Sequence, residues 1–554
     1  MRRAWGAALA AAVIVALAGC VGIPTSGGVN DGAVIDDEAN PEFVVLPSDP
    51  VPGSTPEQIL ADFMQAVSAP QGGYAVAKKY LTGDLASVWN PDASAIIRTG
   101  GSVTEVAGEN TLTYSFSSKA SVNEVGQYTE EQLASAQTLT FAFAQEGGEW
   151  RISQAADGIV LSQSAFGVAF RQQALYFFDP SFGYLVPDVR WFPSRQTTST
   201  LVVQTLLAGP SSWLQQAVVT AFPAATSLGD ITTGAGSVTV DLSTEALTAS
   251  PQARDRMRQQ LVATLDVSNV DMTVRDLPLL TSDAAGDRAT VNPSVDSPVL
   301  IGLDGTAFGF DGGSGIADIA GLTNQVVAAG AVAADLASDK QLVTFLDADG
   351  SVLVARVGDP AATVIDPGPG LVAPAVDPFR FIWSATASNA TTLTAWELDG
   401  TPHAIQTGLP ADSAIVSLDV SRDGARLLLL LSTPVGPRLI AAGIVRQDNV
   451  PVSLGAPIEL PVSLGTPLDA TWVDDRTVAT IAADDTGSAL ITAFEIGGPS
   501  QSLGRVQGAY SIAGGNGGTD GLRVLSTDGE IWRPRGSEGW VSTGISASFL
   551  ATKQ

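Results

Sequence analysis

The first apolar run of the chain is short and lies at its very start. Residues 4–18 are almost wholly Ala, Val, Leu and Ile, and they follow the basic pair Arg2 and Arg3. A basic stretch followed by an apolar run of this length predicts a secretory signal peptide over residues 1–19. A membrane-spanning helix needs about 20 apolar residues, and turn-forming residues follow at 24–28, so the pattern disfavours a transmembrane segment.

Residues 20–53 show no sustained hydrophobic period. They are rich in Gly, Pro, Asp and Ser and include the acidic cluster at 36–38. Such a composition predicts a disordered acidic spacer. The alternative is that the apolar stretch 43–46 docks as an edge strand.

The next segment, residues 54–170, begins with a helical pattern and continues with alternating strands. Thr55 is a plausible N-cap, Pro56 suits the first helical position, and Gln58 can close a capping box. The predicted buried positions are Ile59, Phe63 and Val67 in the helix, and Leu112, Tyr114, Phe116, Leu139, Phe141, Phe143, Trp150 and Ile152 in the strands. This α+β order resembles the NTF2-like cone fold, which can enclose a ligand pocket or an active site. We expect core packing from these aromatics, because no His or Cys accompanies them.

Residues 171–285 predict a second, smaller α+β module. A helix is expected from Thr197 to Ala208, ended by Gly209 and Pro210. The strand positions Val238, Val240 and Leu242 alternate, and Ser250 and Pro251 cap a helix with Met257, Leu261 and Leu265 on one face. Four phrases stand in the order found in GerMN modules of the bacterial envelope: 206–210, 220–223, 240–243 and 260–265. The resemblance implies no catalytic residue. We expect Phe222 and Leu242 to be core residues and Asp241 to cap a turn.

From residue 290 to 554 short apolar runs are separated by Asp-Gly pairs, which are strong hairpin signals. The pairs begin at Asp304, Asp349, Asp399, Asp423 and Asp528. At roughly 45 residues per blade, this segment predicts a β-propeller of six blades, or five; a pair of β-sandwiches is the fallback. The segment 421–427 resembles the blade turn of TolB-like and WD-like propellers. The five-residue phrase 451–455 recurs at 461–465 and is interpreted as a hairpin or a loop between blades.

Composition narrows the classes of partner. The chain carries 57 acidic residues against 28 Lys and Arg, a formal charge of −29. Such a charge excludes nucleic acid as a partner and keeps the protein body from lying on anionic lipid. A hydrophobic content of 45% predicts several well-packed globular domains beyond the spacer.

The one cysteine, Cys20, follows Leu17, Ala18 and Gly19. This phrase resembles the bacterial lipobox, which implies cleavage between Gly19 and Cys20, an S-diacylglycerol group on Cys20 and N-acylation such as palmitate. Two or more acyl chains anchor a protein durably, whereas a single chain is marginal. The alternative is an ordinary cleaved signal with an incidental cysteine. An intrachain disulfide is excluded, because there is no second cysteine.

Catalytic chemistry is hard to assemble from this composition. His403 is the one histidine, so a histidine metal cluster is excluded, and its position after Asp399 and Gly400 predicts an exposed loop residue. A glycosidase needs two carboxylates, but the boxes of sialidase propellers do not occur in the sequence. The segment 347–350 begins like a calcium loop yet lacks the later ligands, and it favours a hairpin turn. We therefore expect no enzyme activity, no metal and no cofactor.

Taken together, the lipobox, spacer, NTF2-like unit, GerMN unit and propeller resemble the actinobacterial lipoprotein LpqB family. The resemblance implies an accessory protein on the extracytoplasmic face of the cell membrane, acting on the sensor kinase of an MtrA–MtrB two-component system in envelope homeostasis and cell division. Two alternatives remain: a lipoprotein that binds cell-wall glycan or a small ligand, and a peptidoglycan-active enzyme.

Overall fold

The computed structural model describes residues 47–105, 110–234, 237–281, 288–293, 299–303, 305–313, 315–514, 517–536 and 539–553. The predicted signal peptide, the cleavage site at Gly19 and Cys20, and the possible edge strand at 43–46 lie outside the described residues. Within those residues, no helix has the length and apolar character needed to cross a bilayer. We name the described parts the N-terminal domain (47–169), the middle domain (170–293) and the C-terminal domain (299–553).

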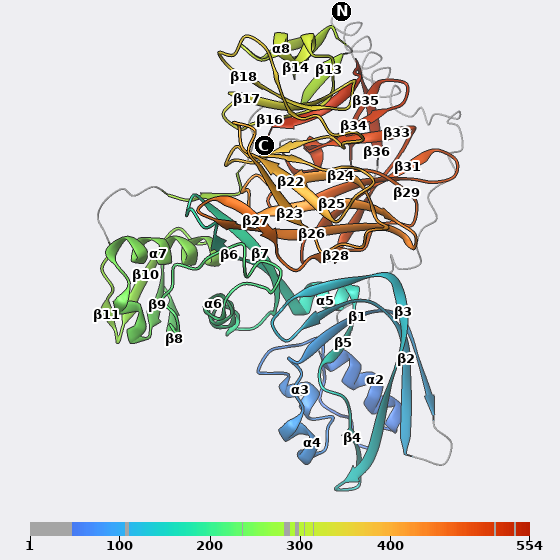
Figure 1. The fold of residues 1–554 in the computed structure, drawn as a ribbon. Helices are drawn as coiled ribbons and strands as arrows, with labels where there is room; N and C mark the ends of the chain where they lie inside the picture. The colour runs from blue at the N-terminus through green and yellow to red at the C-terminus, as the bar shows by residue number, and fades with distance from the viewer. Residues whose placement is uncertain are drawn as a thin grey trace, which may run out of the picture. The chain divides into compact units, whose positions relative to one another are not determined.

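The N-terminal domain is a curved antiparallel sheet with helices on one side (Figure 1). Its elements are α2 (Pro56–Ala66), α3 (Ala75–Lys78), α4 (Gly83–Val88), β1 (Ser94–Glu105), β2 (Thr111–Asn123), β3 (Tyr128–Glu146), β4 (Glu149–Gln154), β5 (Ile159–Ser162) and α5 (Gln163–Ala169). The strand order is β4-β3-β2-β1-β5, with β5 parallel to β1.

Helix α2 begins as the sequence predicts. The Thr55 side chain accepts a hydrogen bond from the Gln58 backbone, and the Gln58 side chain accepts one from the Thr55 backbone, which completes the capping box. Ile59 and Phe63 are buried in one cluster with most of the predicted strand residues of β2 to β4, whereas Leu139 and Trp150 are half-buried at its edge. The expected aromatic core is confirmed: the cavity bordered by Phe63 and Phe141 has a volume of only about 40 Å³.

The last residues of the predicted spacer are held against the N-terminal domain. The Ser48 carbonyl accepts a hydrogen bond from the Tyr80 hydroxyl at 2.8 Å, and Asp49 forms an ion pair with Lys79. The Gly53 amide donates to Glu149 at 2.8 Å. Residues 48–53 are therefore attached to the domain surface, whereas the sequence assigned them to the spacer.

The middle domain combines two small sheets with two main helices. Its elements are β6 (Phe170–Phe178), β7 (Tyr184–Pro193), α6 (Thr198–Ala208), β8 (Leu228–Thr233), β9 (Val238–Leu242), η2 (Thr244–Thr248), α7 (Pro251–Leu265), β10 (Val270–Val274), β11 (Leu277–Pro278) and β12 (Thr290–Val291). The sheets have the orders β11-β10-β9-β8 and β12-β7-β6. Strand β12 pairs with β7, so residues 290–291 pair with the middle domain although the sequence assigned them to the propeller segment.

The predicted helices and core of this domain are confirmed. Helix α6 ends at Ala208, before Gly209, and Ser250 caps α7 by accepting a hydrogen bond from the Ala253 backbone. Phe222 and Leu242 are buried. The Asp241 carboxylate accepts a hydrogen bond from the Asp276 amide at 3.1 Å, in the turn between β10 and β11.

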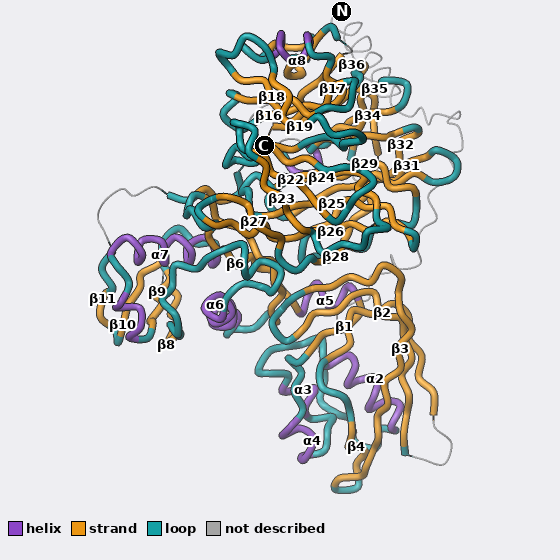
Figure 2. The backbone as a smooth tube through the Cα atoms, in the orientation of Figure 1, coloured by secondary structure: helices purple, strands orange, loops and turns teal. Residues whose placement is uncertain are grey.

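The C-terminal domain is a β-propeller built from consecutive antiparallel strands (Figure 2). Its elements are β13 (Leu300–Leu303), β14 (Ala307–Asp311), β15 (Ile316–Asp318), α8 (Thr323–Ala328), β16 (Ala331–Leu336), β17 (Leu342–Asp347), β18 (Val352–Arg356), β19 (Thr363–Asp366), β20 (Ala375–Val376), β21 (Ile382–Ser384), β22 (Thr392–Trp396), β23 (Pro402–Gln406), β24 (Ala414–Val420), β25 (Arg426–Thr433), β26 (Gly436–Gln447), β27 (Val450–Leu454), β28 (Ile458–Leu460), β29 (Thr466–Trp472), β30 (Thr477–Ala483), β31 (Ser488–Glu495), β32 (Ser500–Gln507), β33 (Ala509–Ala513), η3 (Gly518–Gly521), β34 (Arg523–Ser526), β35 (Glu530–Arg535), β36 (Gly539–Ser546) and β37 (Phe549–Lys553).

Within the described residues these strands form five hydrogen-bonded sheets. Four of them contain β20–β23, β24–β27 with β28, β29–β32 and β33–β36, and the fifth has the order β15-β14-β13-β37-β16-β17-β18-β19. The last strand, β37, lies antiparallel to β13 and parallel to β16. The C-terminal end of the chain is thereby paired with the first strands of the domain.

The predicted Asp-Gly hairpins are confirmed where both residues are described. Gly350, Gly400, Gly424 and Gly529 each have a positive φ and each separates two paired strands. Glycine adopts that conformation at little cost, which explains its place in these turns. Asp304 lies outside the described residues. The phrase 451–455 contributes to β27, and its repeat at 461–465 connects β28 to β29.

Candidate functional site

The middle domain and the propeller share one hydrophobic core. A single cluster of buried side chains continues from one domain into the other. Its members include Leu214, Ala217 and Phe222 from the middle domain, and Leu430, Leu439, Leu460, Trp472 and Phe494 from the propeller. Burial of this extent is typical of a domain interior, so the two domains form one packed unit.

Three glycines let the backbones of these domains approach closely. A Cβ atom on Gly443 would lie 2.7 Å from the Cβ of Ala217, and one on Gly455 would lie 2.9 Å from the Trp213 carbonyl oxygen. At Gly497 the nearest atom would be the Val189 carbonyl oxygen, at 2.9 Å. Any larger residue would force the interface apart at these points.

The N-terminal domain is joined to both of the others by hydrogen bonds. The Gln132 side chain donates to the Val462 carbonyl at 3.0 Å, and Glu130 accepts from the Ser500 amide at 2.8 Å. Arg190 of β7 donates to the Val125 carbonyl at 2.7 Å. All three domains therefore meet around the start of β3.

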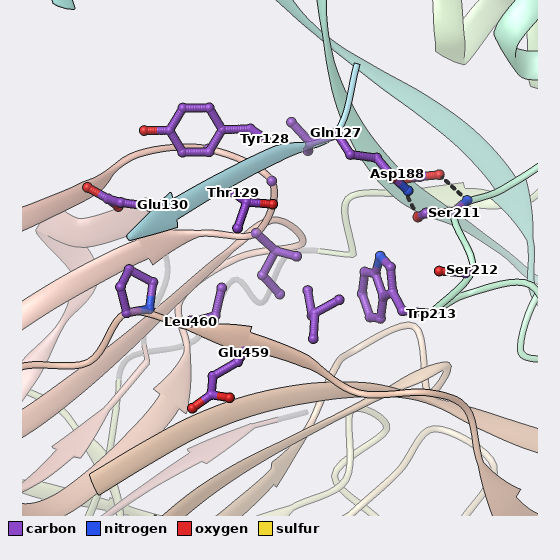
Figure 3. Close-up of a pocket in the computed structure, with 16 residues that line it drawn as sticks. Gln127, Tyr128, Thr129, Glu130, Asp188, Ser211, Ser212, Trp213, Glu459 and Leu460 are labelled. Carbon is purple, nitrogen blue, oxygen red and sulfur yellow. Dashed lines mark hydrogen bonds between the residues drawn. The ribbon is translucent and has the colours of Figure 1, made fainter. Parts of the chain in front are cut away.

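A cavity of about 310 Å³ lies at this meeting point (Figure 3). Its walls come from the N-terminal, middle and C-terminal domains. They include Tyr128 and Glu130 from the first, Asp188 and Trp213 from the second, and Glu459 and Leu460 from the third. This volume is at the lower end of the range for small-molecule sites.

Trp213 gives the cavity its main aromatic surface. The side chain is only 6% exposed, and Figure 3 shows its ring beside the open space. A hydrogen bond from its indole nitrogen is not found within the described residues. Tyr128, the first residue of β3, packs its ring on Phe166 and Trp191, and burial raises the pKa of its hydroxyl. An aromatic wall whose indole N–H has no partner among the described residues suits an apolar or sugar-like ligand.

The carboxylates around the cavity are already engaged. Asp188 is buried and accepts four hydrogen bonds, two from Arg190 at 3.1 and 2.8 Å and two from Ser211 at 2.7 Å. Glu459 forms a two-point contact with Arg438, both distances being 3.0 Å. Charge-assisted pairs of this geometry hold a wall in place. The arrangement provides a shaped binding surface.

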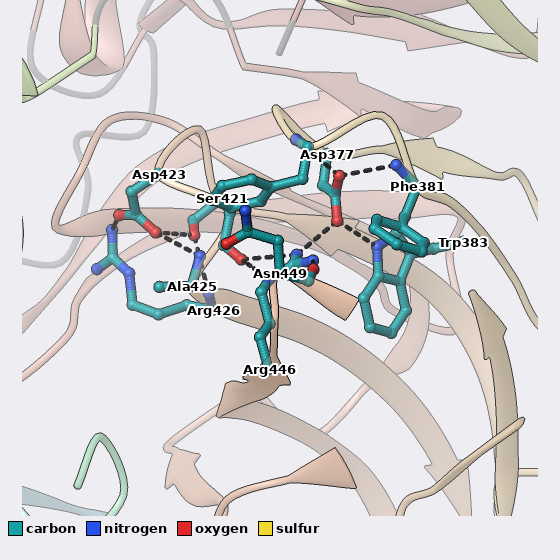
Figure 4. A network of polar contacts seen from close by, with 11 residues as sticks. Asp377, Phe381, Trp383, Ser421, Asp423, Ala425, Arg426, Arg446 and Asn449 are labelled. Carbon is teal, nitrogen blue, oxygen red and sulfur yellow. Dashed lines mark hydrogen bonds and ion pairs between the residues drawn. The ribbon is translucent and has the colours of Figure 1, made fainter. Parts of the chain in front are cut away.

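A second buried polar cluster lies in the propeller, around the segment 421–427 (Figure 4). Asp423 accepts hydrogen bonds from Ser421 and from the Ala425 amide, and it pairs with Arg426. Nearby, Asp377 pairs with Arg446 at 2.5 Å. The predicted blade turn is thus a closed network whose polar groups hold neighbouring sheets together.

His403 differs from its prediction as an exposed loop residue. It lies within β23, its side chain is 26% exposed, and its Nε2 is 2.8 Å from Glu397 Oε1. The strand begins at Pro402, two residues after Gly400, and His403 pairs with Ala395 of β22. The Phe381 ring packs edge-on against it at 5.9 Å between centroids.

The structure also resolves the question of the segment 347–350. The Asp347 carboxylate accepts hydrogen bonds from the Asp349 and Ser351 amides, at 3.0 and 2.8 Å. It therefore closes the hairpin between β17 and β18, as the sequence favoured. Among the residues that the structure describes, no group of three or more His, Cys, Asp or Glu side chains is placed to hold a metal ion.

Family comparisons agree with the order of domains. Residues 49–167 match the model "Lipoprotein LpqB, N-terminal domain", residues 174–276 match "Sporulation and spore germination" (Germane), and residues 310–546 match "Lipoprotein LpqB beta-propeller domain". The chain is thus a multidomain propeller protein of the bacterial lipoprotein class, and lipoproteins of this class are held at a membrane by lipid. It belongs to the lipoprotein LpqB family.

Individual relatives have moderate identity. A lipoprotein LpqB of Thermobifida fusca is 25% identical, over 90% of this chain and 91% of that protein. A second, from Cutibacterium acnes, is 29% identical over 53% of this chain, and the match spans about half of that protein, 52%. A hydrazine synthase from Kuenenia stuttgartiensis is a solved structure with a TM-score of 0.31 and 13% identity, covering 44% of this chain and 78% of that chain. That score is too low to support an argument about function.

Proposed function

We propose that the chain is a non-enzymatic accessory lipoprotein on the extracytoplasmic face of the cell membrane, anchored by lipid on Cys20. In this proposal it binds the extracytoplasmic domain of a sensor kinase of the MtrA–MtrB type and shifts that kinase's signalling equilibrium. The observation that carries the proposal is the continuous core between the middle domain and the propeller. A partner that contacts one of these domains is thereby coupled mechanically to the other.

Two finer features of the fold belong to the same proposal. The eight-stranded sheet divides naturally between β37 and β16, which are parallel, into two blades of four strands. With the other four sheets this gives six blades, closed by pairing of β37 with β13. The N-terminal domain, with α2 packed on a curved sheet, is of the NTF2-like type. A propeller displays many loops on a rigid frame, which suits recognition of another protein.

The proposal is tested with the full-length lipoprotein in lipid nanodiscs and the extracytoplasmic domain of the kinase from the same organism. Calorimetry at physiological salt should give saturable binding with a micromolar or lower Kd, since long-range surface charge is screened there. Regulation also requires that the protein binds one kinase conformation more tightly than the other. Absence of binding, or equal affinity for both conformations, would overturn the proposed function.

The anchor is tested separately in cells. Cys20→Ser removes the thiol that would carry diacylglycerol, so we expect the protein to leave the membrane fraction and lose acyl labelling. Export of the Cys20→Ser protein with its signal peptide still attached would also support the proposal, because in the proposed route the signal peptide is cleaved only after lipidation. Continued acyl labelling of the Cys20→Ser protein would overturn the assignment of Cys20.

A second candidate function is binding of a small ligand or a cell-wall glycan, favoured by the cavity beside Trp213. Ligand occupancy there would bridge all three domains and could itself be the signal that the kinase reads. Trp213→Phe keeps the ring packing and removes the N–H donor. If this site binds a ligand, the substitution should weaken binding several-fold, and thermal unfolding of the variant measures separately the cost of the smaller ring in the shared core.

A further inference from the structure

A separate cavity of about 760 Å³ lies where the middle domain adjoins the N-terminal domain. Gln71 contributes from the N-terminal domain, and Arg171, Gln172, Ser194 and Arg195 contribute from β6 and the loop that follows β7. This volume is within the range of pockets for small organic ligands and is far larger than a single phosphate requires. The site described beside Trp213 shares none of these residues.

The charge of this cavity is opposite to that of the chain. Two of its lining side chains are arginines and none is Asp or Glu, whereas the whole chain has 57 acidic residues and a formal charge of −29. Arg195 is oriented by an ion pair with Asp92 at 2.8 Å. Arg171 is exposed, and no ion pair or hydrogen bond of its side chain is found within the described residues. Its guanidinium is thus available to a ligand.

Three polar atoms of the wall are donors without a partner among the described residues. They are the Gln172 side-chain nitrogen, the Ser194 hydroxyl and Arg195 Nε, all buried, and the described part of the chain offers none of them a hydrogen-bond partner. A buried donor left without a partner costs free energy, and small rotations of these half-buried side chains would bring them to a bound molecule. Gln173 differs, because its side chain donates to the Thr264 carbonyl and is held in place.

The adjacent helix adds to the preference for an anion. Helix α6 has 11 residues and begins at Thr198, which also lines the cavity. Its N-cap Thr197 makes no capping hydrogen bond through its side chain. The first-turn amides of a helix carry partial positive charge and bind oxyanions. This end of the helix therefore supports the two arginines.

We propose that this cavity binds an anionic sugar, in which a carboxylate or phosphate group is held by Arg171 and Arg195. Arginine holds such groups through two parallel hydrogen bonds. The amides of Gln71 and Gln172 and the Ser194 hydroxyl contact the sugar hydroxyls, since amides and hydroxyls both donate and accept. This proposal stands apart from kinase binding and does not depend on it.

The experiment uses the full-length lipoprotein in nanodiscs of zwitterionic lipid and four probes: glucuronate, glucose 6-phosphate, glucose and inorganic phosphate. Calorimetry should show saturable binding of at least one charged sugar, at least tenfold tighter than glucose. The preference between glucuronate and glucose 6-phosphate identifies the acidic group. Binding should weaken as salt is raised, because it depends on charge.

Variants test whether the binding belongs to this cavity. Arg171→Gln should weaken binding of the charged sugar about tenfold or more, and Gln71→Glu, which places a negative charge at the rim, should weaken it as well. Arg535→Gln, at an exposed arginine of β35, is the matched control and should bind normally.

The proposal is overturned if neither charged sugar binds, if glucose binds as tightly, or if Arg171→Gln binds like the original protein. Inorganic phosphate binding as tightly as glucose 6-phosphate, with no binding of glucuronate, would overturn the assignment to a sugar. Thermal unfolding of each variant distinguishes these results from a loss of folding, and Arg171 was chosen because its exposed side chain supports no described contact.

Discussion

At the scale of single residues, buried aspartates connect neighbouring sheets of the propeller. In three places a carboxylate on β16, β24 or β29 accepts a hydrogen bond from a backbone amide on the first strand of the next sheet. The pairs are Asp335 with Val376 at 2.8 Å, Asp419 with Trp472 at 3.0 Å, and Asp469 with Ile512 at 2.9 Å. Burial raises the pKa of Asp335 and of Asp469, the latter to about 6.

Asp469 therefore makes stability depend on pH. Because its pKa is higher in the folded than in the unfolded chain, the folded state binds more protons between pH 4 and 6, and the contribution of this group to stability decreases as pH rises through that window. Asp469→Asn keeps an acceptor for the Ile512 amide and removes the titration. Between pH 4.5 and 7.5, the free energy of unfolding of the variant should rise relative to the original by on the order of 2 kcal/mol.

Denaturant unfolding at several pH values checks this difference. Asp484→Asn is the control, because hydrogen bonds from Thr486 lower the pKa of that exposed carboxyl. The lowered pKa of Asp484 gives stability that is present above the unfolded pKa and is lost only at lower pH, so the control should stay nearly level between pH 4.5 and 7.5. An unchanged pH profile for Asp469→Asn would contradict the prediction.

The buried pair between Asp377 and Arg446 should cost far more to break than an exposed ion pair. Asp377 also accepts hydrogen bonds from the Trp383 indole at 3.0 Å and the Phe381 amide at 2.9 Å. Asp377→Ala leaves a buried guanidinium without its counter-charge, which costs about 3–5 kcal/mol of unfolding free energy. Arg505→Ala removes an exposed ion pair with Asp484 and should cost about 1 kcal/mol or less. Equal losses in denaturant unfolding would contradict this account.

At the scale of elements, the sequence predicts the ends of helices and the turns of hairpins wherever one residue type determines the backbone geometry. The capping box of Thr55 and Gln58, the end of α6 at Gly209, and the Asp-Gly hairpins all follow from such rules. The sequence wrongly placed His403 in a loop. Strand β23 begins only two residues after Gly400, and local sequence signals define the ends of strands poorly. The cavity beside Trp213 was not predicted, since its walls come from residues 128, 213 and 459, which only the tertiary fold brings together. Gly443, in the otherwise apolar middle of β26, was the available signal of close packing.

Strand β37 should be essential for closing the propeller. It supplies pairing to β13 on one side and to β16 on the other, and Phe549 and Ala551 are buried in the core next to Phe308. Ending the chain after Ser548 would leave two unpaired strand edges, which favour aggregation. We expect loss of the cooperative unfolding transition and an increase in aggregation, measured by calorimetry and light scattering. Removal of Gln554 alone is the control and should have no effect.

At the scale of the whole molecule, docking of the middle domain on the propeller determines how the protein responds to a partner. The shared core contains Phe222 and Leu214 on one side and Leu439 and Trp472 on the other. Separate domains usually unfold in separate steps, and a continuous core joins such steps into one. We therefore expect the middle domain and the propeller to unfold together.

Gly443→Ala tests this coupling by adding one methyl group at the contact between the two domains. The added methyl group would lie 2.7 Å from the Cβ of Ala217 and 2.9 Å from the Trp213 carbonyl oxygen, and the glycine has no positive φ, so the effect is steric. Overpacking of this kind costs about 1–3 kcal/mol. Gly167→Ala is the matched control: it lies in α5 with no atom within 4 Å of the new Cβ, and alanine there should be neutral or stabilising by up to about 1 kcal/mol. Scanning calorimetry should show a lower or divided transition for Gly443→Ala alone. If Gly443→Ala keeps a single transition at the original temperature, the two domains are less tightly packed than their shared core indicates. That result would remove the mechanical basis for transmitting a binding event from the middle domain to the propeller.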